Sequence, residues 1–123
     1  MKLTPPRVPK TDKRLLGTWR SDRQRTLKEW SFPPGTTRKH RRFLRGIFGK
    51  LRLTFTRKHI QYVLKDWRHV AEYRVIGRDA YSVATISLDF LGKEWHVEHI
   101  HFDGKNSFWI SVGRNREFFK RVS

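Results

Sequence analysis

The sequence contains no cysteine among its 123 residues. This absence excludes disulfides, thiolate metal sites and cysteine nucleophiles. No apolar run approaches the ~20 residues that a membrane-spanning helix needs, and the basic start of the chain lacks the apolar segment of a secretory signal. We therefore expect a soluble, cytoplasmic protein, with which the lack of cysteine is compatible.

Acidic residues are also scarce. Eleven Asp and Glu stand against 28 Lys and Arg, which gives a formal net charge of +17. Residues 1–50 hold 15 of the basic residues but three of the acidic ones, so the excess is concentrated there. A surface of this kind attracts phosphate polymers or anionic membranes. General solubility by charge explains the same composition equally well.

Large aromatic residues are abundant, with five Trp, nine Phe and three Tyr. A chain of this length forms one domain with a modest core, and these rings must supply much of its buried area. Residues 1–13 hold three of the five prolines and four basic residues. We interpret residues 1–13 as a flexible basic tail and residues 14–123 as a single domain.

The periodicity of the apolar residues changes along the chain. Ser21 or Asp22 can cap a first helical stretch, and residues 38–48 have amphipathic helical spacing. From residue 50 onward the period is two, which is typical of strands. Strands are predicted at 15–20, 51–55, 60–64, 67–76, 80–89, 94–102, 106–112 and 116–122.

Short turns separate the predicted strands from residue 51 onward, so sequential neighbours must pair antiparallel as a meander. About eight strands can hide their edges by closing into an up-and-down barrel. The predicted fold class is therefore mainly β: one small antiparallel barrel, with one or two short helices between the first and second strands.

The segment Leu16-Gly17-Thr18-Trp19 at the start of this meander resembles the Gly-x-Trp motif of the calycins, the lipocalins and fatty-acid-binding proteins. In those families the Trp plugs one end of the barrel, and a basic residue of the last strand packs across it. The resemblance implies that Trp19 is the plug and Arg121 its partner. An Arg plane over an indole also gains a cation–π contact.

The resemblance implies a ligand inside the barrel. Phe119 occupies the place of the Tyr in the Arg-x-Tyr clamp of fatty-acid-binding proteins, and Arg116 is off by one residue, so that clamp does not carry over. We expect non-covalent binding of a small, anionic or amphipathic molecule, without a cofactor. The expected lining residues are Tyr62, Tyr73, Trp95, His99 and His101.

Three of the six histidines lie in the segment Trp95-His96-Val97-Glu98-His99-Ile100-His101. On a strand, His99 and His101 share a face, and His96 points the other way. Two histidines on one face are a two-ligand geometry for zinc, with His69 or Asp89 as third-ligand options, but we assign no metal site. Acid–base chemistry by Glu98 with His96 or His99 stays open, and we assign no catalytic residues and expect a binding protein.

The alternative function is nucleic-acid binding through the basic segment at residues 38–45. Its cationic side chains suit phosphate contacts. Exposed aromatic residues on a sheet could stack on bases. The residues proposed for this alternative are Arg38, Lys39, Arg41, Arg42 and Arg45. The sequence does not specify the oligomeric state.

Overall fold

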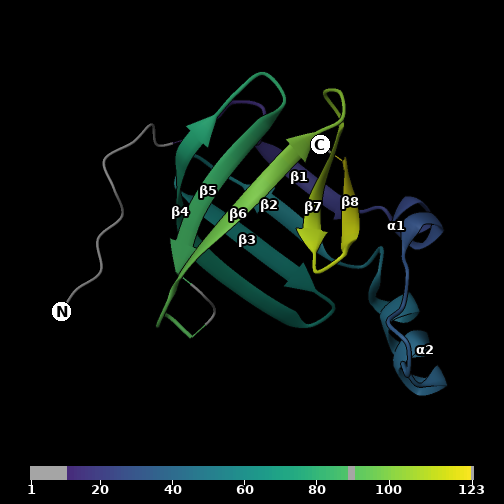
Figure 1. The fold of residues 1–123 in the computed structure, drawn as a ribbon. Helices are drawn as coiled ribbons and strands as arrows, with labels where there is room; N and C mark the ends of the chain where they lie inside the picture. Colours follow the sequence, from purple (N-terminus) through teal and green to yellow (C-terminus); the bar gives the residue numbers. More distant parts are fainter. Residues whose placement is uncertain (1–10, 89–90, 123) are drawn as a thin grey trace.

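The computed structural model describes residues 11–88 and 91–122. Within them, eight strands form one closed antiparallel barrel in which each strand pairs with its neighbours in sequence and β8 pairs with β1 (Figure 1). The strands are β1 (Gly17–Ser21), β2 (Arg52–Phe55), β3 (His59–Leu64), β4 (Trp67–Arg78), β5 (Ser82–Leu88), β6 (Trp95–Phe102), β7 (Ser107–Val112) and β8 (Asn115–Arg121).

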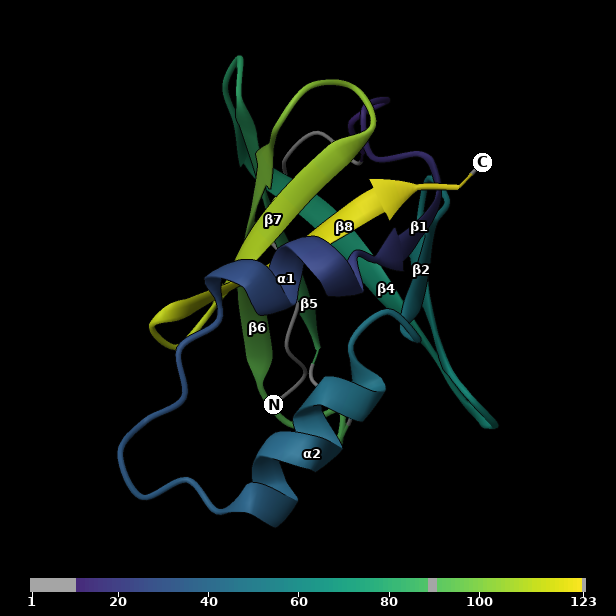
Figure 2. The ribbon, with the colours of Figure 1, turned by 90° about the vertical axis from the view of Figure 1, so that its right-hand side faces the viewer.

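Two helices, α1 (Arg23–Glu29) and α2 (Arg38–Ile47), lie between β1 and β2. The Asp22 side chain caps α1 by accepting a hydrogen bond from the backbone of Arg25. Helix α1 packs on the outside of β8, where the Thr26 hydroxyl accepts a hydrogen bond from the backbone of Phe118. Helix α2 buries none of its residues and extends away from the barrel (Figure 2).

Trp19 closes one end of the barrel. Its side chain is fully buried and donates from Nε1 to the carbonyl of Leu15 at 2.9 Å. The guanidinium carbon of Arg121 lies 4.2 Å from the centre of the Trp19 ring. Arg121 also donates to the carbonyls of Leu16 and Arg14, at 2.7 Å each. The pairing implied by the calycin resemblance is therefore present as a cation–π contact, which two hydrogen bonds hold in place.

The segment before β1 packs against the same end. Asp12 is buried. Its carboxylate forms one ion pair with Arg14, at 2.9 Å, and a second with Arg78, at 3.6 Å. The Arg14 side chain lowers the pKa of Asp12 through this hydrogen-bonded contact, although burial opposes the shift. Residues 11–13 thus contact the barrel, and residues 1–10 of the expected tail lie outside the described residues.

Gly49 joins the helical segment to the barrel. Its φ of +89° lies in the left-handed region, and a Cβ built there would stand 2.8 Å from the Cβ of Arg23. Its N–H donates to the Ser21 hydroxyl at 3.0 Å, and its carbonyl accepts from Arg20 at 2.8 Å. Glycine is required because both the conformation and the space exclude a side chain.

The predicted fold class is confirmed. The described residues form eight strands in a closed antiparallel barrel, and two short helices follow the first strand as expected. The ends of elements differ by a few residues, because the period alone does not define where pairing stops. Residue 89, the predicted end of one strand, lies outside the described residues. No helix in the described part of the chain is long and apolar enough to span a membrane.

The Trp19 plug predicts a large loss of stability on truncation. We expect Trp19→Ala to lower the free energy of unfolding by ~3–5 kcal/mol, because it leaves a cavity and removes the ring beneath Arg121. Urea denaturation measures the change. The control is Tyr81→Ala, whose side chain is 78% exposed and which should change stability by less than about 0.5 kcal/mol. Equal stability of the two variants would contradict the plug role.

Candidate functional site

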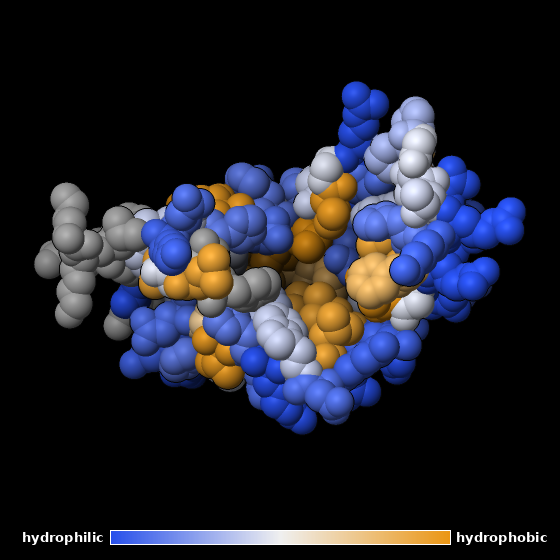
Figure 3. Space-filling view, turned by 90° about the horizontal axis from the view of Figure 1, so that it is seen from below, coloured by the Kyte–Doolittle hydropathy of each residue, from blue (hydrophilic) through white to orange (hydrophobic). Residues whose placement is uncertain are grey.

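The two ends of the barrel differ. The turns β2–β3, β4–β5 and β6–β7 lie at the end closed by Trp19, and the connections β1–β2, β3–β4, β5–β6 and β7–β8 lie at the other. A cavity of about 260 Å³ extends inward from this second end. Seen from below, the surface is hollowed, and apolar residues line the hollow (Figure 3).

Most of the cavity wall is apolar. Four Phe and Tyr rings belong to it: Phe55 of β2, Tyr62 of β3, Phe108 of β7 and Phe119 of β8. These rings lie among aliphatic side chains from β2, β3, β7 and the ends of neighbouring strands. The apolar and aromatic lining residues are Leu51, Leu53, Phe55, Ile60, Tyr62, Leu88, Ile100, Phe108, Ile110 and Phe119.

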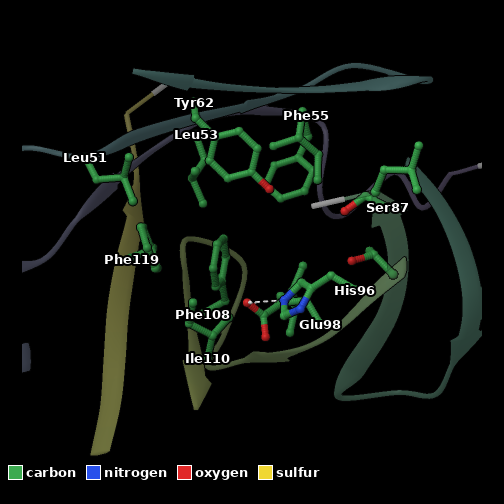
Figure 4. A pocket seen from close by; sticks show the side chains of 14 residues that line it. Leu51, Leu53, Phe55, Tyr62, Ser87, His96, Glu98, Phe108, Ile110 and Phe119 are labelled. Carbon is green, nitrogen blue, oxygen red and sulfur yellow. Dashed lines mark ion pairs between the residues drawn. The ribbon is translucent and has the colours of Figure 1, made fainter. Parts of the chain in front are cut away.

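The remaining wall is polar and comes from β5 and β6. Thr85 and Ser87 of β5 pair across the ladder with Glu98 and His96 of β6, respectively. His96 Nε2 lies 3.7 Å from Glu98 Oε1. In Figure 4 the Glu98–His96 pair lies on one side of the cavity, and Tyr62 lies on the other. Among the described lining residues there is no Lys or Arg.

The surroundings of the cavity shift the ionisation of its acids. Burial raises the pKa of Glu98, and the neighbouring His96 and His99 offset part of the rise. Glu117 of β8 pairs across the ladder with Ile110 of β7. Burial also raises the pKa of Glu117, and the charge of Glu98 adds to this rise. The hydrogen bond that Glu117 accepts from the Ser21 hydroxyl, at 3.1 Å, opposes it. The interior therefore disfavours negative charge.

Tyr62, one of the five expected lining residues, does line the cavity. Burial, with a smaller effect from Glu98, raises its pKa to about 12. Tyr73 is buried deeper, in the closed end, where its hydroxyl donates to the Thr56 carbonyl at 2.7 Å and lies 2.8 Å from the Thr11 hydroxyl. It is a core residue and is not part of the cavity wall.

The other three expected lining residues lie on the outer face of β6. Trp95, His99 and His101 alternate with the inward-facing His96, Glu98 and Ile100, and none of the three lines the cavity. The expectation that they line the interior is corrected, because the other face of this strand points inward. The lining residues missed in the sequence include His96 and Glu98.

On the outer face, His101 stacks on Trp109 of β7, with 3.9 Å between ring centres and 12° between planes. The guanidinium carbon of Arg116 from β8 lies 4.2 Å from the centre of the Trp109 ring. Burial, reinforced by His99 and Arg116, lowers the pKa of His101. The stack is a contact between three strands on the outer face, and its surroundings disfavour the protonated form of His101.

In the part of the chain that the structure describes, no three His, Asp or Glu side chains are grouped so that they could hold a metal ion. His69 pairs across the ladder with Tyr62, which lines the interior, whereas His99 and His101 point outward. Asp89, the other third-ligand option, lies outside the described residues.

The cationic residues of α2 are exposed. Arg38, Arg41, Arg42 and Arg45 line a shallow depression that Arg23 of α1 completes. Lys39 is exposed on the same helix, and Phe43 is 62% exposed among these charges. The structure therefore presents the basic segment to solvent, separate from the cavity.

Comparison of the chain with models of protein families, with curated proteins and with solved structures found no match. The function must therefore be argued from the geometry of the cavity and of the basic helix.

The raised pKa of Glu117 predicts a pH-dependent stability. Its folded-state pKa lies above the unfolded value of 4.5, so its contribution is fully present below pH 4.5 and is lost as pH rises through the folded pKa. Glu98 from β6 and Ser21 from β1 face the same carboxyl. We expect Glu117→Gln to gain stability relative to the native protein as pH rises from 4 to 7, because glutamine does not ionise.

Thermal unfolding at several pH values measures this difference. The control is Glu72→Gln, whose side chain is 84% exposed on β4, and its difference from the native protein should not change with pH in this way. Parallel pH profiles for Glu117→Gln and the native protein would refute the assignment.

Proposed function

We propose that the protein binds a small amphipathic molecule, non-covalently, inside the barrel. The observation that carries this proposal is the division of the cavity into two walls. Thr85, Ser87, His96 and Glu98 form the polar wall, and aromatic and aliphatic side chains form the other. A guest with one polar and one apolar part satisfies both walls, because buried polar groups need partners and apolar surface gains from leaving water.

The dimensions of the cavity limit the size of the guest. Small-molecule sites usually have volumes of ~300–1,000 Å³, and a cavity of about 260 Å³ lies just below this range. Eight-stranded barrels have interiors that side chains fill or that hold one small ligand. The guest is therefore smaller than most drug-sized molecules.

The barrel is compatible with a calycin-like fold, and this supports the proposal by analogy. The closed antiparallel meander, the Trp19 plug and the Arg121 contact are the features that resemble lipocalins and fatty-acid-binding proteins. Fold analogy alone does not specify a function, so the two-walled cavity remains the principal support.

Filling the cavity should abolish binding. Ser87 is buried on the polar wall, and Ser87→Phe places a ring in the space a guest would occupy. We expect 2-phenylethanol, a neutral amphipathic probe, to shift the amide NMR signals of the lining residues in the native protein. In Ser87→Phe these shifts should be lost.

The matched control is Ile86→Phe, the adjacent position on the opposite face of β5, where the added ring points outward. This variant should retain the shifts. If neither 2-phenylethanol nor a phenyl probe with a charged head group perturbs the lining residues of the native protein, the proposed function is wrong.

A second candidate function is binding of nucleic acid by α2. The specific observation is that α2 buries none of its residues and exposes its cationic side chains beside Arg23. Phosphate contacts by such side chains release counterions and make binding salt-dependent. This surface is separate from the cavity, so the two functions are tested independently.

Removing the charge of α2 tests this candidate. We expect glutamine at positions 38, 39, 41, 42 and 45 to weaken binding of a 20-base-pair DNA duplex. The slope of log Kd against log salt should also fall, by about 0.9 for each phosphate that the variant no longer neutralises. Fluorescence anisotropy at several salt concentrations measures both quantities.

The control removes five exposed basic side chains away from α2: Arg52, Arg57, Lys58, Arg68 and Lys105. This control lowers the net charge by the same amount but leaves α2 intact. It should therefore retain most of the affinity for the duplex. Similar losses in both variants would mean that net charge, and not α2, binds the duplex.

A further inference from the structure

The cavity combines a carboxylate with aromatic rings inside a strongly basic protein. The chain carries a net charge of +17, yet Glu98 is the lining residue with an acidic side chain, and the described lining residues include no Lys or Arg. The cavity therefore carries an acidic group without a Lys or Arg among its described lining residues, whereas the protein as a whole is strongly basic. The polar end of a bound molecule must therefore complement the acidic side chain of Glu98.

We infer that the polar end of the guest is a protonated amine that binds the carboxylate of Glu98. This inference rests on the proposed function, because it assigns the head group of a molecule held in the same cavity. A carboxylate can accept more than one hydrogen bond, so an ammonium group can bind Glu98 while His96 stays 3.7 Å from Oε1.

The apolar wall supports the same head group. Phe55, Tyr62 and Phe108 all line the cavity, and ring faces attract cations, most strongly where water is excluded. Phe55 and Phe108 lie edge to face, with 6.5 Å between their centres. An arylalkyl amine would place its chain or ring among these residues and its charge at Glu98.

The interior selects against the opposite head group. A carboxylate guest would lie beside Glu98, where like charges repel and burial already disfavours ionisation. The basic surface does not reverse this preference, since bulk salt screens exposed charges within about 8 Å at physiological ionic strength. Glu98 acts at direct contact.

Three probes with a common phenyl group test the head group: 2-phenylethylamine, 2-phenylethanol and 3-phenylpropanoate. Isothermal titration calorimetry measures their affinities, and amide NMR shifts confirm that each binds in the cavity. We expect the amine to bind about tenfold or more tightly than the alcohol, because its ammonium group adds the attraction between opposite charges to the hydrogen bond with Glu98. The carboxylate should bind more weakly than the alcohol.

Glu98→Gln keeps the size of the side chain and removes its charge. It should abolish the preference for the amine and leave the affinity for the alcohol nearly unchanged, which shows that the variant still folds and binds. The control Glu72→Gln removes the same charge from an 84% exposed side chain and should keep the preference.

Two failures are distinguishable. If the alcohol or the carboxylate binds in the cavity as tightly as the amine, the inference about the head group is overturned and the proposed function stands. If none of the three probes perturbs the lining residues, both are overturned. Persistence of the amine preference in Glu98→Gln would also overturn the assignment to Glu98.

Discussion

The pairing of β1 with β8 is the constraint on which the rest of the structure depends. This ladder places Trp19 opposite Arg121 and Ser21 opposite Phe119. Without it the sheet would have two open edges, and neither face of any strand would be enclosed. The plug lies on the closing ladder itself, so the contact between Arg121 and Trp19 stabilises the closure and the end of the barrel together.

Closure also explains why the cavity is at one end. Aromatic rings fill the interior near the plug, where Trp19 lies 4.6 Å from Phe108 between ring centres, and Phe55 lies 5.7 Å from Tyr73. Toward the other end, β5 and β6 contribute Thr85, Ser87 and other polar side chains in place of large rings. The space left by these smaller and more hydrated groups is the cavity.

The sequence predicted the strand number, the order and the helical segment, because turns and changes of period are local signals. The inward face of β6 could not be predicted in the same way. One face carries His96, Glu98, Ile100 and Phe102, and the other carries Trp95, Val97, His99 and His101, so both faces mix polar and apolar residues. A period of two therefore does not choose between them.

Pairing with a neighbour makes the choice. The register sets Ile100 opposite Val83 of β5, and both are buried in the core, so His96 and Glu98 must face inward with Ile100. Tyr62 was predictable because β3 has one clearly apolar face. The charge of the cavity was not, since net charge reports on the surface and not on which few polar groups a barrel encloses.

The hydroxyl of Ser21 connects the helical segment with an ionisable group inside the barrel. This hydroxyl accepts from the N–H of Gly49, where α2 rejoins the barrel, and donates to the interior carboxyl of Glu117. Bonds in such a chain polarise one another, so ionisation of Glu117 strengthens the hold of Ser21 on Gly49. The protonation of Glu117 is thus thermodynamically linked to the attachment of the helical segment at Gly49. The link passes through a single oxygen atom, that of the Ser21 hydroxyl.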